Sequence, residues 1–156
     1  MRLCEQGALV SEAGVEHGVD ASELDEVVRS APKPVRPEEV SAELIFSDPV
    51  ASATVGIWRF SAGDWSAILK VLRHGTSGSP LWRSGEEESH WYYWRREALA
   101  YSSDLLDAFI DGVRAPRCLA VFDRPDGSVA IWLEDLRHTQ PAAAWDVGGT
   151  AWPPWR

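Results

Sequence analysis

Several absences narrow the classes of protein to which this sequence can belong. The chain has only two cysteines, Cys4 and Cys118, which are too few and too far apart for a disulfide framework or a zinc site. No apolar run approaches the roughly 18 residues that a membrane-spanning helix needs, and no signal-peptide core follows Met1. The sequence therefore predicts a cytoplasmic protein with no metal site and no membrane partner.

Positive charge is also scarce. The chain carries 24 acidic residues against 15 basic ones, which gives a net charge of −9, and most of the surplus lies in residues 1–50. A protein that binds a phosphate backbone normally presents a basic face, and none is evident here. We therefore expect no nucleic-acid partner.

The 156 residues suit one domain, or one lobe of a larger domain. Residues 1–38 form an acidic extension that ends in a proline-rich linker, and Leu24, Val27 and Val28 recur in it at helical spacing. The same segment is also compatible with a loosely attached tail. We expect the folded lobe at residues 39–137, followed by an irregular tail at residues 138–156.

Alternation of apolar and polar residues predicts strands from residue 40 onward. Ala42, Leu44 and Phe46 alternate with polar residues, as in a half-buried strand. Runs at residues 54–60 and 65–73 follow, joined by a glycine-containing turn, so the three runs form an antiparallel meander.

A helix and two further strands complete the expected order β-β-β-α-β-β. The helix is expected to begin after Ser89 as its cap, with a buried stripe made of Trp94, Ala98, Tyr101 and Leu105. Strands are expected at residues 118–122 and 128–133, on either side of a strong turn sequence. The sequence thus predicts an α+β fold, with a five-stranded antiparallel sheet and one main covering helix.

Lys70 is one of only two lysines and lies inside a predicted strand. Strand alternation places it on the face of Ile68 and Leu72, opposite the face of Leu69. Two interpretations are open: a lysine that extends to water from an exposed strand, or a lysine held under the sheet by a carboxylate. Glu97 lies along the apolar stripe of the helix and offers that carboxylate, although a helix glutamate commonly pairs with a neighbouring arginine instead.

Three segments carry a resemblance to a known family. They are WSAILKVLR, HWYYWRREALAY and RAPRCLAVFDRPDGSVAIWLEDL, and over about residues 40–146 the chain resembles the small lobe of aminoglycoside phosphotransferases and related small-molecule kinases. The resemblance implies a protein-kinase-like N-lobe in which Lys70 contacts the α/β-phosphates of ATP and Glu97 orients it. It also implies a hinge whose backbone, at Glu134 and Leu136, reads the adenine edge, and a loop over the phosphates at residues 47–53.

The chain departs from that family in its catalytic residues. The large lobe of the family supplies a His-Gly-Asp catalytic loop, a downstream asparagine and a metal-binding aspartate. Here His74 and Gly75 are followed by Thr76 and precede the helix, and the chain has no asparagine at all. We therefore expect no catalytic or metal-binding residues in this chain, weak or absent ATP binding, and no bound Mg²⁺. The irregular end of the sequence also suggests a truncated coding sequence.

The resulting functional expectation is an ATP-binding small lobe that is catalytically incomplete. In full-length relatives such a lobe serves ATP-dependent phosphorylation of a hydroxyl group on a small molecule. Two alternatives remain open. One is a non-enzymatic interaction module that binds a protein partner, or a second copy of itself, through the exposed underside of the sheet. The other is a non-functional truncated remnant.

Overall fold

The computed structural model describes residues 19, 21–47, 53–75, 83–107 and 114–136. Their elements are, in chain order, α2 (Ala21–Val28), the 3₁₀ turn η1 (Pro37–Glu39), β1 (Ser41–Phe46), β2 (Thr54–Ala62), β3 (Trp65–Leu72), α3 (Arg96–Tyr101), the 3₁₀ turn η3 (Asp104–Asp107), β4 (Cys118–Asp123) and β5 (Val129–Glu134). The strands form one antiparallel sheet in the order β1-β2-β3-β5-β4. The predicted α+β class and five-stranded antiparallel sheet are confirmed.

Two tight turns set the strand order, and glycine is required in both. Gly63 connects β2 to β3 with φ +55°, and Gly127 connects β4 to β5 with φ +80°, a backbone region that favours glycine. In the second turn the Asp126 carboxylate accepts hydrogen bonds from the Ser128 backbone N–H at 3.0 Å and from its hydroxyl at 2.6 Å. These bonds hold the pKa of Asp126 below its usual range, so the turn is fixed by its own side chains.

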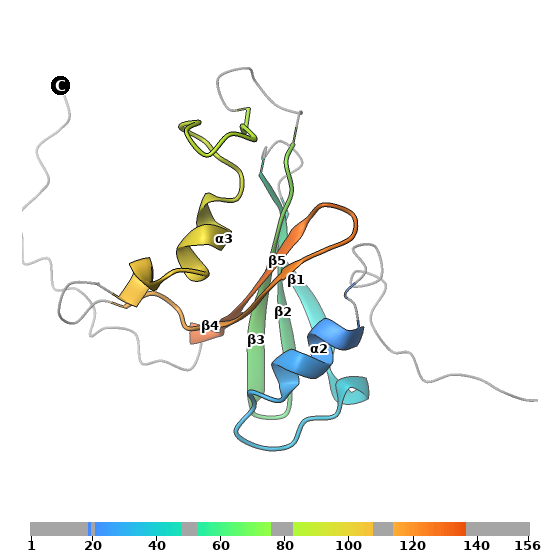
Figure 1. Ribbon diagram of the computed structural model, residues 1–156. Helices are drawn as coiled ribbons and strands as arrows, with labels where there is room; N and C mark the ends of the chain where they lie inside the picture. Colours follow the sequence, from blue (N-terminus) through green and yellow to red (C-terminus); the bar gives the residue numbers. More distant parts are fainter. Residues whose placement is uncertain (1–18, 20, 48–52, 76–82, 108–113, 137–156) are drawn as a thin grey trace, which may run out of the picture.

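The two faces of the sheet are covered by different helices (Figure 1). On β3, the side chains of Trp65, Ala67, Leu69 and Val71 join one core with the apolar residues of α2. Ile68 and Leu72 belong to a second core that includes Ala98 of α3. The face assignment expected from strand alternation is therefore confirmed for β3.

Helix α2 is attached to the sheet by a buried ion pair. The Glu23 carboxylate accepts two hydrogen bonds from the Arg124 guanidinium, at 2.8 and 2.7 Å. The two side chains are 5% and 7% exposed, and the Trp132 indole N–H lies 3.4 Å from the same carboxylate. The alternative of a loosely attached tail therefore does not apply to this helix.

The predicted helix after residue 89 is wrong in its bounds. Helix α3 begins at Arg96, without a side-chain cap, and ends at Tyr101. Before it, the Gly85 backbone N–H donates to the Tyr92 carbonyl, and the Trp94 backbone N–H donates to the Gly85 carbonyl. These are not the hydrogen bonds of an α-helix. Ser89 is therefore no cap.

Two sets of residues that were expected to be buried are more exposed to solvent: the last residue of the helical stripe and the apolar residues of the first strand. Leu105 belongs to η3 and is 68% exposed, because the α-helical stripe stops four residues earlier. On the edge strand β1, Leu44 and Phe46 are each 45% exposed, and the pairing register with β2 shifts between them. The strand itself is confirmed, but its apolar side chains are only partly covered.

Among the described residues, no helix combines the length and apolar character needed to cross a lipid bilayer.

Gly56 in β2 leads to a stability prediction. A Cβ atom at this position would lie 2.5 Å from the ring of Trp58, which is 3% exposed and has little room to move. We expect Gly56→Ala to lower the free energy of unfolding by about 2 kcal/mol, measured by urea denaturation followed by circular dichroism. In a Trp58→Phe background the same change should cost clearly less. Equal costs in both backgrounds would contradict the steric explanation.

Candidate functional site

The centre of the candidate site is the contact between Lys70 on β3 and Glu97 on α3. The Lys70 ammonium donates a hydrogen bond to a Glu97 carboxylate oxygen, and the two side chains are 21% and 37% exposed. Lys70 stands between Ile57 of β2 and Ile131 of β5 in the sheet. The predicted pairing of these two residues across the sheet and the helix is confirmed.

The arginines beside Glu97 have other partners. Arg95 forms an ion pair with Asp123, and the Arg96 guanidinium donates to the backbone carbonyls of Trp91 at 2.7 Å and His90 at 2.8 Å. The ordinary alternative, in which Glu97 pairs with a neighbouring arginine, is therefore not what the structure contains.

Two weakly acidic groups, Tyr101 and Cys118, pack on the core that includes Ala98 of α3. Burial, together with the charge of Glu97, raises the pKa of Tyr101. Burial also raises the pKa of the Cys118 thiol. Both groups therefore stay protonated at neutral pH and add no negative charge that would compete with Glu97 for Lys70.

An open hollow of about 410 Å³ continues the face that carries Lys70. Its apolar surface includes Ile68, which lies two residues before Lys70 on β3, and Leu133, the partner of Ile68 on β5. Leu136 closes one side and is 40% exposed. Lys70 and Glu97 do not line this hollow.

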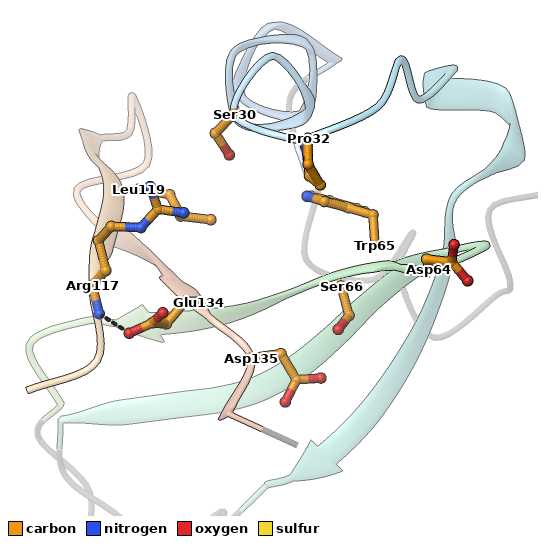
Figure 2. Close-up of a pocket in the computed structure, with 9 residues that line it drawn as sticks. All are labelled: Ser30, Pro32, Asp64, Trp65, Ser66, Arg117, Leu119, Glu134 and Asp135. Carbon is orange, nitrogen blue, oxygen red and sulfur yellow. Dashed lines mark hydrogen bonds between the residues drawn. The ribbon is translucent and has the colours of Figure 1, made fainter. Parts of the chain in front are cut away.

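Glu134 lies in the hollow wall, and both its carboxylate and its backbone N–H have partners. Its carboxylate accepts hydrogen bonds from the Arg114 guanidinium and from the Arg117 backbone N–H, the latter at 2.6 Å (Figure 2). The bond from Arg114 holds the pKa of Glu134 below its usual range. The Glu134 backbone N–H donates to the Arg117 carbonyl at 2.9 Å. Both predicted hinge residues, Glu134 and Leu136, thus line one hollow.

Sequence reasoning missed a second ion pair in the hollow wall. Arg59 of β2 donates from Nε to the Asp135 carboxylate at 2.9 Å and from Nη1 to Glu43 at 3.2 Å, and the Asp135 side chain is only 4% exposed. Burial lowers the pKa of Arg59, but the two carboxylates outweigh burial and raise it overall. The register of the sheet puts Arg59 opposite Ile68, beside the pair formed by Ile57 and Lys70. The sequence places Arg59 in a strand, but it carries no local signal that identifies Asp135 as its partner.

Other sequence predictions fall outside the described residues. Positions 48–52 of the loop expected over the phosphates are among them, as is the tail at residues 138–156. Within the described part of the chain, no group of three or more histidine, cysteine, aspartate or glutamate side chains is arranged to hold a metal ion.

Comparisons of the chain with protein-family models, with curated proteins and with solved structures gave no match. The geometry of the described residues is therefore the basis for the functional argument.

Proposed function

We propose that residues 40–136 form a nucleotide-binding small lobe of the kinase-like type found in aminoglycoside phosphotransferases. In this proposal the Lys70 ammonium binds the α/β-phosphates of ATP, Glu97 orients Lys70, and the hollow beside Glu134 and Leu136 receives the base. The observation that carries the proposal is the contact between Lys70 and Glu97, which joins the middle of the sheet to the helix across it.

The spacing along β3 supports this arrangement. A strand advances about 3.3 Å per residue, so Lys70 lies about 7 Å beyond Ile68 on the same face. A base that rests on Ile68 and Leu133 would therefore direct its phosphates along the strand toward Lys70. The Lys70 side chain is partly exposed, so a ligand can reach it while Glu97 keeps it in place.

The proposal covers binding rather than phosphoryl transfer. Transfer requires a group that positions the acceptor hydroxyl and side chains that hold Mg²⁺. The chain has no asparagine, and His74 and Gly75 lead into Thr76 instead of an aspartate. We therefore propose weak ATP binding and no transfer of phosphate to small hydroxylated acceptors by this chain alone.

The test is a titration of the full chain with ATP and Mg²⁺, followed by isothermal calorimetry. We expect weak saturable binding, and we expect Lys70→Ala to reduce the affinity at least about tenfold, because a charge-assisted hydrogen bond to phosphate is lost. Glu97→Gln should cause a smaller loss, since it leaves the ammonium present but less well oriented.

The other lysine provides a matched control. Lys33 pairs with Asp64 at the surface, where the two side chains are 77% and 88% exposed, and Lys33→Ala should leave ATP affinity unchanged. If Lys70→Ala and Lys33→Ala bind ATP equally well, the phosphate-binding role of Lys70 is wrong. Absence of any ATP binding by the unmodified chain at millimolar concentration would count equally against it.

A second candidate function is protein interaction. Trp91 is 58% exposed and Leu105 is 68% exposed, on the stretch around α3, and such apolar side chains favour association. The ATP titration distinguishes the two functions, because an interaction module would not lose nucleotide affinity specifically with Lys70→Ala.

A further inference from the structure

A second hollow, of about 200 Å³, lies between the end of α2 and the ends of β3 and β5 (Figure 2). Pro32, Trp65 and Leu119 supply its apolar surface, and Arg117 lies at one side. Trp65 belongs to the face of the sheet that packs on α2. This hollow therefore lies apart from the face that carries Lys70, although Glu134 and Asp135 contribute to both hollows.

The acidic residues around this hollow already have cationic partners. Asp64 pairs with Lys33, Glu134 pairs with Arg114, and Asp135 pairs with Arg59. Each of the three carboxylates therefore has a cationic partner, although Arg59 is shared with Glu43.

Arg117 is the cation that remains. Within the described residues, its guanidinium forms no hydrogen bond and no ion pair, although its charge contributes to the lowered pKa of Glu134. A guanidinium binds carboxylates well, so an unpaired one at the edge of a hollow is a donor for an anionic ligand.

Trp65 supplies a second donor. The residue is 8% exposed, and its indole N–H has no hydrogen-bond partner in the part of the chain that the structure describes. Figure 2 shows the indole nitrogen on the side of the ring that faces Arg117 and Leu119. The indole nitrogen itself is not fully buried, so an acceptor atom in this hollow can reach it and replace water as its partner.

We propose that this hollow binds a small organic anion, namely a carboxylate attached to a flat apolar group. The carboxylate would accept hydrogen bonds from Arg117 and from the Trp65 indole, and the apolar group would pack between Pro32 and Leu119. The volume of about 200 Å³ suits a molecule the size of benzoate and is small for a whole nucleotide. This inference does not depend on the nucleotide-binding proposal.

The test uses benzoate as the probe and the ¹⁵N-labelled full chain as the sample. The Trp65 indole resonance is assigned by its loss in Trp65→Phe, and we expect it to shift saturably with a Kd of about 1 mM. Benzyl alcohol, which has the same ring and no charge, should bind at least about tenfold more weakly because it lacks the ion pair with Arg117. Once the resonance is assigned, this comparison needs only the unmodified protein.

A variant tests whether benzoate binds at Arg117 or is attracted by any exposed arginine. Arg117→Gln keeps a polar side chain and removes the charge, and it should lower benzoate affinity at least about tenfold. Arg29→Ala removes an exposed arginine just beyond α2 and should have no effect. Equal affinity in Arg117→Gln, a shift that does not saturate, or tighter binding of benzylamine than of benzoate would each overturn the proposal.

Discussion

Glu23→Ala is expected to lower the free energy of unfolding by about 3 kcal/mol. The change leaves the Arg124 guanidinium, 7% exposed, without the carboxylate that accepts two hydrogen bonds from it. Removing one partner of a buried ion pair typically costs about 3–5 kcal/mol. Urea denaturation followed by tryptophan fluorescence measures the loss.

Two further variants test whether the loss of stability comes from the ion pair between Glu23 and Arg124. Glu26→Ala changes an exposed glutamate on the same helix and should stay within about 0.5 kcal/mol of the unmodified protein. The double variant Glu23→Leu with Arg124→Met replaces the pair by apolar side chains of similar volume and should recover most of the stability. If Glu23→Ala proves as stable as Glu26→Ala, the ion pair does not hold α2 on the sheet.

The strands were predictable because strand alternation is a local signal. In β3 the side chains of Trp65, Ala67, Leu69 and Val71 are buried on one face, as the period of two requires. The length of the helix was not predictable in the same way. Its apolar stripe continues through helical spacing, but the backbone of Tyr92 and Trp94 bonds to Gly85 across a loop, and sequence periodicity carries no information on that contact.

In the candidate site, too, one ion pair was predictable from the sequence and another was not. Lys70 and Glu97 could be paired from sequence because each is a charged residue on an apolar face, and a buried charge needs a partner. Arg59 and Asp135 are 76 residues apart, and Glu23 and Arg124 are 101 apart. Such pairs depend on how the ends of distant elements meet, which local patterns do not specify.

Trp132 connects the stability of the fold to the candidate site. The residue is fully buried in β5, its ring lies 4.8 Å from that of Phe60, and its indole N–H contacts the Glu23 carboxylate. Its strand neighbours Ile131 and Leu133 face the opposite side, toward Lys70 and the hollow. Packing on the α2 face therefore supports the strand that presents the proposed binding surface.

We expect Trp132→Ala to lower the free energy of unfolding by about 4 kcal/mol, since removing a buried tryptophan leaves a large cavity. That is a large part of the total stability of an ordinary domain, about 5–15 kcal/mol, so ATP affinity should fall together with thermal stability. Circular dichroism and calorimetry on the same samples measure both effects. Trp91→Ala, at a side chain that is 58% exposed, is the matched control and should change neither. A stable Trp132→Ala variant with reduced ATP affinity would contradict this coupling, because the loss would then arise without any weakening of the sheet.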